Sequence, residues 1–292
     1  MDIKFKQVDV FTDRRYGGNP VAVILDGTGL DTEQMQQIAN WTNLSETTFV
    51  LPATTHDADY RVRIFTQRNE LPFAGHPTLG TAHALLESGL VKAKNGELVQ
   101  ECGAGLVRLR VKQIEQGQHI AFELPQPKVT VLSDDQTDAL ESLLGGNILR
   151  DPPARLIDVG PKWIVAQLPD AASVLALRPD LQRMTELDQH VGSTGVTVFG
   201  KHPIGHAVAL EVRTFAPSVG VSEDPVCGSG NGAVAVYVRE SGQVETLGSN
   251  FQSGQGTCVG RQGRIQVEFG SNGEIRIGGQ SITCIDGVLI KP

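Results

Sequence analysis

Cysteine, aromatic residues and excess positive charge are scarce in this chain of 292 residues. Its four cysteines form no C-x-x-C pair, which argues against a zinc knuckle or a redox dithiol and favours a reducing cytoplasm. The net charge of -8 argues against nucleic acid or an anionic membrane as the main partner. No apolar run approaches the roughly 18 residues of a membrane span, and Asp2, Lys4 and Lys6 interrupt any signal peptide. We therefore expect a soluble cytoplasmic protein.

Several catalytic and cofactor motifs are missing as well. No glycine-rich stretch has P-loop spacing, and no G-x-G-x-x-G opens a helix after a parallel strand. The G-x-S-x-G elbow of serine hydrolases is absent, as is any metal or haem signature. We therefore expect a protein that uses no cofactor and no metal.

What the chain does contain is one order of elements, repeated in each half. Alternating apolar residues predict strands, and the capping boxes of Asp31 with Gln34 and of Ser133 with Gln136 each predict the start of a helix. Both halves read strand, turn, strand, helix, strand, strand, acidic loop, glycine turn and helix, which suggests an internal duplication. Further strands are predicted over 98–114, 265–269, 274–278 and 281–290.

A break at Pro125, Gln126 and Pro127 divides the two halves. We therefore predict an N-terminal lobe over residues 1–126 and a C-terminal lobe over 127–292, whose last strand could return to the first lobe. The predicted fold class is α/β, with mostly antiparallel strands around a helix in each lobe. Equivalent loops of the two lobes would then face each other across a ligand cleft.

The chain is organised around residues 223–232, where two carboxylates lead into a glycine turn and a small-residue helix. The first N–H groups of a helix have no intrahelical acceptor and carry the positive end of its dipole, so they favour an anion. A second copy of the turn runs through 74–78. The backbone of Gly75, Gly228 and Gly230 and the hydroxyl of Ser229 are therefore candidate binders of a small carboxylate substrate. The alternative is an ordinary loop-to-helix junction with glycines for tight packing.

Three polar side chains near these turns are candidates for the chemistry. Glu46 precedes an apolar strand, where partial desolvation would raise the pKa of its carboxyl and suit it to proton transfer. His76 could donate a hydrogen bond to a substrate carboxylate or carbonyl, and Asp224 could accept one from a substrate hydroxyl or amine. The alternatives are a solvated glutamate, a histidine that caps its helix and an aspartate that holds loop N–H groups.

Cys227 has two interpretations. At a helix N-terminus the pKa of its thiol would fall, which would make it a thiolate and a possible second base. Alternatively, it is a small buried hydrophobe. Arg261, in the glycine-rich region 254–263, is a further candidate to pair with a carboxylate of the protein or of a ligand.

Several of these stretches, taken in order, resemble the phenazine-biosynthesis PhzF-like family, within the diaminopimelate-epimerase fold. The resemblance covers nearly the whole chain. It rests on Asp-Val-Phe-Thr (9–12), Gly-Asn-Pro (18–20), Ser-Glu-Thr (45–47), Phe-Ala-Gly-His-Pro-Thr (73–78), Glu-Asp-Pro (223–225) with Gly-Ser (228–229), and Gln-Gly (255–256) with Gly-Arg (260–261). The family implies two mirrored α/β lobes, each a barrel-like sheet around a central helix, with the site between them and often a homodimer.

The resemblance also implies a cofactor-free, biosynthetic isomerisation, in which Glu46 moves a proton between carbons of an unsaturated hydroxy-amino acid. His76, Asp224 and Ser229 match the family's substrate-contacting residues. Relatives that epimerise amino acids use two cysteines, whereas this chain has Ala74 and Cys227 at those positions, so a two-thiol mechanism is excluded but a pair of Glu46 and Cys227 is not. Three functions therefore stay open: an isomerase, an amino-acid racemase or epimerase, and a non-catalytic protein that binds a small acid.

Overall fold

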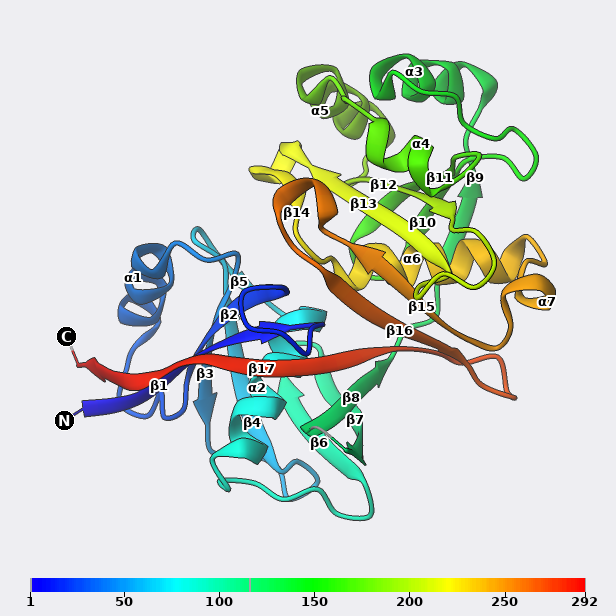
Figure 1. Cartoon of the computed structure of the whole chain (residues 1–292). Helices are drawn as coiled ribbons and strands as arrows, with labels where there is room; N and C mark the ends of the chain where they lie inside the picture. The colour runs from blue at the N-terminus through cyan, green and yellow to red at the C-terminus, as the bar shows by residue number, and fades with distance from the viewer. Residues whose placement is uncertain (1, 116, 292) are drawn as a thin grey trace. The chain divides into compact units, whose positions relative to one another are not determined.

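The computed structural model describes residues 2–115 and 117–291. The chain divides into two compact units (Figure 1), of which unit 1 comprises residues 1–123 and 278–292 and unit 2 comprises residues 124–277. Strands dominate both units, and the α/β class predicted from the sequence is confirmed. Among the described residues, no helix is long and apolar enough to cross a membrane.

Unit 1 is a closed barrel of strands around one helix. The strands of the barrel are β1 (Asp2–Val10), β2 (Asn19–Ile24), β3 (Thr47–Leu51), β4 (Tyr60–Phe65), β6 (Glu97–Cys102), β7 (Gly105–Ile114), β8 (Gly117–Glu123) and β17 (Ile275–Ile290). The ring closes because β17 pairs with both β1 and β8. Two neighbouring pairs, β2 with β3 and β4 with β6, are parallel, whereas the β1–β17, β1–β2, β3–β4, β6–β7 and β7–β8 pairs are antiparallel.

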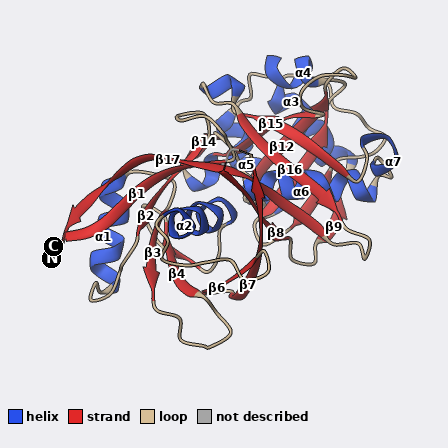
Figure 2. Cartoon of the chain, turned by 60° about the horizontal axis from the view of Figure 1, so that its bottom comes forward, coloured by secondary structure: helices blue, strands red, loops and turns tan. Residues whose placement is uncertain are grey.

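The central helix of unit 1 is α2 (Gly75–Glu87), and Figure 2 shows it enclosed by these strands. Small side chains let it fit there: a Cβ on Gly80 would clash with Val21 of β2. Helix α1 (Thr32–Thr42) starts at the predicted capping box of Asp31 and Gln34 and packs on β3 and β4. The short strand β5 (Glu70–Leu71) pairs antiparallel with the end of β4.

Unit 2 repeats this plan with extra helices on its outer side. Its strands are β9 (Lys128–Val131), β10 (Arg155–Asp158), β11 (Lys162–Gln167), β12 (Gly195–Lys201), β13 (Leu210–Ala216), β14 (Val221–Asp224), β15 (Asn250–Gln255) and β16 (Gly263–Phe269). The central helix is α6 (Gly228–Glu240), which packs on β10, β11, β12 and β16 and is followed by the short helix α7 (Val244–Leu247). Each unit is therefore a sheet built around one central helix, as the resemblance implies.

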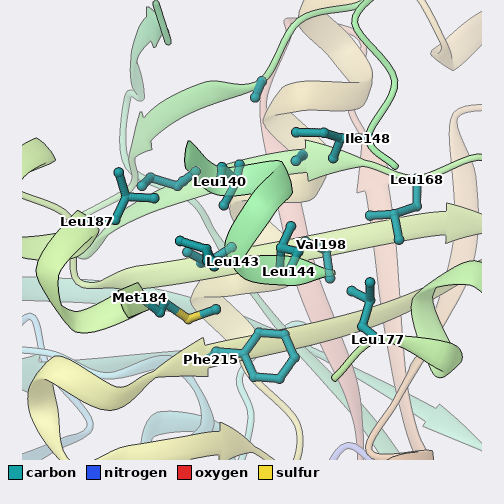
Figure 3. Packing of buried hydrophobic residues seen from close by; sticks show 14 of the residues in the cluster. Leu140, Leu143, Leu144, Ile148, Leu168, Leu177, Met184, Leu187, Val198 and Phe215 are labelled. Atoms are coloured by element: carbon teal, nitrogen blue, oxygen red, sulfur yellow. The ribbon is translucent and has the colours of Figure 1, made fainter. Parts of the chain in front are cut away.

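The outer helices of unit 2 cover an apolar core. They are α3 (Asp134–Leu144), α4 (Ala171–Ala176) and α5 (Leu181–Val191), of which α3 begins at the predicted capping box of Ser133 and Gln136. Figure 3 shows leucines of α3 meeting Met184 of α5 and Phe215 of β13. Alternate residues of β11, such as Ile164 and Ala166, point into this core, which leaves Trp163 and Val165 for the opposite face.

The strands predicted over 98–114, 274–278 and 281–290 are confirmed, but the breaks between them were predicted wrongly. Residues 98–114 form the hairpin β6–β7, because the chain turns at Gly103, where a Cβ would lie 2.8 Å from Pro72 Cα, and at Gly105, whose φ of 101° suits glycine. Residues 274–278 and 281–290 are one continuous strand, β17, which pairs with β1 over most of its length. The first three residues of β17 belong to unit 2 and the remainder to unit 1.

Candidate active site

Unit 1 brings two of the predicted residues together. Glu46 directly precedes β3, and His76 is the second residue of α2. Glu46 Oε2 lies 3.3 Å from His76 Nε2, and the two side chains are only 16% and 8% exposed. Glu46 is therefore not the solvated loop residue that was its alternative.

The ionisation of His76 follows from its burial, which lowers the pKa of the imidazole to about 3. The ring is therefore neutral at physiological pH, and its contact with Glu46 is not an ion pair. The backbone of Pro20 is its other partner. Since proline has no N–H, a ring nitrogen of His76 must donate to the Pro20 carbonyl, and this nitrogen is Nδ1 because Nε2 faces Glu46. Nε2 then carries the lone pair, so a protonated Glu46 can share its proton with His76.

The N-terminus of α2 also keeps two backbone donors. Ala74 is the N-cap and provides no side-chain hydrogen bond, and the third helical residue, Pro77, has no N–H. The remaining first-turn amides are those of Gly75 and His76, which have no acceptor within the helix. Gly75 lies against Phe122, where an added Cβ would come within 2.8 Å of the ring. The first turn of α2 is thus a place where the backbone can bind an anion.

Unit 2 places Asp224, Cys227 and Ser229 in the turn that leads into α6. Asp224 ends β14, and its Oδ1 accepts a hydrogen bond of 3.0 Å from the Val226 N–H. The Cys227 thiol also donates to this carboxylate, yet burial raises the pKa of Asp224 to about 6. Asp224 therefore holds the turn, as its structural alternative predicted, and titrates near neutral pH.

Cys227 is the N-cap of α6, and its sulfur accepts the Gly230 N–H at 3.3 Å. Burial, reinforced by the nearby Asp224 carboxylate, raises the pKa of the thiol well above its usual value. The thiolate that its helix-terminal position predicted is therefore disfavoured, because desolvation outweighs the dipole. The Gly230 N–H is likewise occupied by sulfur rather than available to a substrate, which leaves Gly228 and Ser229 as first-turn donors.

Two further residues support this turn, and sequence reasoning gave neither a role. Gln255 Nε2 donates to the Asp224 carbonyl at 2.9 Å, while its Oε1 accepts the Cys227 N–H at 3.1 Å and the Asn231 side chain at 2.7 Å. Trp163 Nε1 donates to Ser229 Oγ at 3.1 Å. Only the family motif that includes Gln255 could have pointed to its role, and no motif in the sequence near Trp163 pointed to that residue.

Arg261 follows the short 3₁₀ turn after β15. A Cβ on Gly256 would lie 2.5 Å from the Pro225 carbonyl and 2.6 Å from Arg261 Cβ, so this loop packs on the turn that follows Asp224. The buried Nε of Arg261 has no hydrogen-bond partner among residues 2–115 and 117–291. Within those same ranges there is no group of three or more His, Cys, Asp or Glu able to hold a metal ion.

Comparison with known proteins places this geometry in a family. The phenazine biosynthesis-like family PhzC-PhzF matches residues 8–287. The chain is 46% identical to antisense-enhancing sequence 1 of Schizosaccharomyces pombe, over 97% of each chain. It is 32% identical to the trans-2,3-dihydro-3-hydroxyanthranilate isomerase of Pseudomonas chlororaphis, over 97% of this chain and 98% of the relative.

A solved structure shows the same fold. The Bacillus anthracis phenazine biosynthesis protein of the PhzF family superposes with a TM-score of 0.87 and 24% identity, over 99% of each chain. A family match across nearly the whole sequence and a relative named as an isomerase agree with the resemblance seen in the motifs. The chain belongs to the phenazine biosynthesis-like PhzC-PhzF family and is an isomerase of PhzF-like type.

Proposed function

We propose that this isomerase moves a proton on a small carboxylate-bearing metabolite by general acid–base catalysis, without a cofactor. The observation that supports the proposal most directly is the buried pair of Glu46 and neutral His76, 3.3 Å apart. The neutral imidazole can accept a hydrogen bond from a protonated Glu46, and the ionised carboxylate can take a proton from carbon, so the pair is equipped for this work.

In the proposed reaction Glu46 removes a proton from a carbon next to a carboxylate or imine and returns it to another carbon of the same molecule. The substrate is isomerised, with no net gain or loss of atoms or electrons. The N–H groups of Gly75 and Gly228 stabilise the negative charge that develops, and Asp224 and Ser229 bind the polar groups of the substrate. A positioned acid–base group contributes about 10²–10⁴ in rate, and an oxyanion donor about 10²–10³.

The proposed substrate class is an unsaturated or amino-acid-like small acid. The relative from Pseudomonas chlororaphis is named for trans-2,3-dihydro-3-hydroxyanthranilate, which has this chemistry. The half-buried Asp224 suits a substrate amine or hydroxyl, and the first turn of α6 suits its carboxylate. We also propose, from the family resemblance, that the protein is a cytoplasmic homodimer, which light scattering of the purified protein and fractionation of the cell would test.

The test follows proton exchange rather than product identity. Wild-type protein is incubated in D₂O with trans-2,3-dihydro-3-hydroxyanthranilate, and ¹H NMR measures deuterium entering the compound. We expect exchange in the wild type, none in Glu46→Gln, and wild-type exchange in Glu33→Gln, an exposed glutamate of α1 that serves as the matched control. Binding should survive in Glu46→Gln. Undiminished exchange in that variant would remove Glu46 from the proposed role.

A racemase that pairs Glu46 with Cys227 is the second candidate function. The raised pKa of Cys227 and its hydrogen bond to Asp224 argue against it, because a base must be deprotonated to act. Cys227→Ser separates the two functions, since an isomerase that depends on Glu46 keeps its activity and a racemase does not. A wild type that binds small acids but exchanges no hydrogen would instead indicate a binding protein.

A further inference from the structure

Trp163 contacts one of the proposed substrate-binding residues without itself belonging to the motifs of the family. It lies on β11, on the face opposite the core formed by the outer helices, and is 4% exposed. Its indole Nε1 donates to Ser229 Oγ at 3.1 Å, across 66 residues of sequence. The contact therefore joins a strand of the sheet to the second residue of the central helix.

The neighbouring strand leaves space for this indole. Trp163 pairs with Gly195 of β12 in the parallel ladder. A Cβ on Gly195 would lie 2.9 Å from Trp163 Cζ3 and would also clash with the Phe215 carbonyl. The indole is thus fixed on one side by close packing and on the other by its bond to Ser229, so its N–H has a defined direction.

The chemistry of the two groups decides which way the Ser229 proton points. An indole N–H can only donate, so Ser229 Oγ must be the acceptor in this bond. The serine hydroxyl then keeps its own proton for another partner. Cys227 Sγ lies 3.6 Å away, but a thiol sulfur is a weak acceptor compared with a carboxylate. Trp163 therefore leaves Ser229 ready to donate.

Unit 1 contains the matching arrangement. The second residue of α2 is His76, and it is held by the backbone of Pro20 on β2, the strand that corresponds to β11. Both β2 and β11 pair in parallel with the next strand of their unit. In each unit, then, the corresponding strand orients the second residue of the central helix. In unit 1 the Pro20 carbonyl of β2 holds His76, and in unit 2 the Trp163 indole of β11 holds Ser229.

We propose that Trp163 is a positioning residue, whose indole N–H holds Ser229 so that the serine hydroxyl donates to the acidic group of the substrate. The role in binding rests on the proposed function, whereas the orientation of Ser229 does not. Loss of the indole N–H leaves the hydroxyl free to rotate and weakens its bond to the acid. Loss of the indole N–H should therefore raise KM, and it should do so only when Ser229 is present.

The orientation is tested without any substrate. The chain has two tryptophans, and Trp41 is 80% exposed on α1, so Trp41→Phe leaves Trp163 as the only indole signal. In this background, ¹⁵N NMR should show a Trp163 indole N–H that exchanges slowly with water. Adding Ser229→Ala should speed that exchange and move the indole proton upfield. An unchanged shift and exchange rate would overturn the contact.

The effect on binding is tested by a double-mutant cycle with trans-2,3-dihydro-3-hydroxyanthranilate. We expect Trp163→Phe, which keeps the ring but not the N–H, to raise KM about five- to tenfold, the cost of one net hydrogen bond, with kcat within about twofold. In the Ser229→Ala background the same substitution should change KM by less than about twofold. Trp41→Phe is the matched control and should change neither.

Equal effects of Trp163→Phe in both backgrounds would overturn the proposal, because they would show that the indole acts through packing and not through Ser229. A wild type that neither binds nor converts the compound would overturn the proposed substrate class instead. In that case the indole exchange experiment still supports or overturns the orientation of Ser229. Failure of the inference and failure of the proposed function are therefore distinguishable.

Discussion

The central helices α2 and α6 are each 13 residues long and both begin with glycine, but they satisfy their first turns differently. In α2 the third amide is missing because that residue is Pro77, while in α6 the third amide, that of Gly230, donates to the sulfur of Cys227. Both routes leave the first two amides for a ligand. The first turn of each helix therefore keeps two amides without an acceptor in the helix, and the third amide is accounted for by different means in the two units.

The second residue of each helix shows how the two units have diverged. In α2 it is His76, whose buried neutral ring lies beside Glu46 and can accept a hydrogen bond from its protonated form. In α6 it is Ser229, which holds no titratable proton and is fixed by Trp163. Under the proposed function, proton transfer therefore belongs to unit 1 and the binding of the substrate's polar groups to Asp224 and Ser229 of unit 2.

The largest expected difference between the units comes from a repeated ion pair. Arg213 of β13 makes two hydrogen bonds to Glu223, with side chains 6% and 12% exposed, whereas Arg63 of β4 makes the same pair with Glu70 at 19% and 40%. Glu223→Gln should lower the free energy of unfolding by about 3–5 kcal/mol, because it leaves Arg213 buried without its counter-charge. Glu70→Gln should cost less than about 1 kcal/mol.

Urea denaturation of the two variants measures this difference. Each arginine also lies over the phenylalanine two residues further along its strand, at 5.0 Å for Phe65 and 4.9 Å for Phe215. Arg213 in addition donates to the carbonyls of Val174 and Leu177, whereas Arg63 donates to the Thr32 hydroxyl. Similar losses of unfolding free energy in Glu223→Gln and Glu70→Gln would mean that the deeper burial of the Arg213–Glu223 pair does not make it more important for stability.

The next largest effect is an opposite pH dependence at the two helix starts. The pKa of Asp224 is raised from 3.8 to about 6, so the stability that depends on its protonated form is lost as pH rises from about 4 to 6. The pKa of His76 is lowered to about 3, so the stability that depends on its neutral ring is lost as pH falls below 6.5. Asp224 is only half-buried, so about 3 kcal/mol is an upper value for its share.

Thermal unfolding between pH 4 and 7.5 checks these signs. Relative to wild type, Asp224→Asn should remove the part of the stability that declines from pH 4 to 6. His76→Gln should remove the part that declines from pH 6.5 to 4. Parallel profiles for the wild type and both variants would contradict the comparison.

The smallest effect concerns the helix caps. Cys227→Ala removes the acceptor of the Gly230 N–H and should cost about 1 kcal/mol of unfolding free energy. Ala74→Ser should give a smaller gain, because Pro77 has no N–H and the new hydroxyl can accept only from the His76 N–H. Differential scanning calorimetry would detect both outcomes. A rise in Tm for Ala74→Ser as large as the fall for Cys227→Ala would contradict the idea that Pro77 limits the capping of α2.

Local signals predicted the parts of the fold that depend on neighbouring residues. The capping boxes at Asp31 and Ser133 marked two helix starts, because their hydrogen bonds span only three residues. The contact of Trp163 with Ser229 joins residues 66 positions apart, and no local pattern encodes it. The choice between the two interpretations of Cys227, a thiolate or a small buried hydrophobe, could not be made from sequence for the same reason. The helix dipole can be inferred from sequence, whereas the burial that outweighs it arises only from tertiary packing.

Strand β17 has a consequence for how the protein is made. The barrel of unit 1 closes only when β17 pairs with β1 and β8, and the part of β17 that belongs to unit 1 comes from residues 278–290, which follow all of unit 2 in the sequence. During synthesis, β1 to β8 leave the ribosome well before this strand exists. Until then β1 and β8 have unpaired edges, so unit 1 cannot finish folding while unit 2 is still being translated. The first unit in the sequence is the last to be completed.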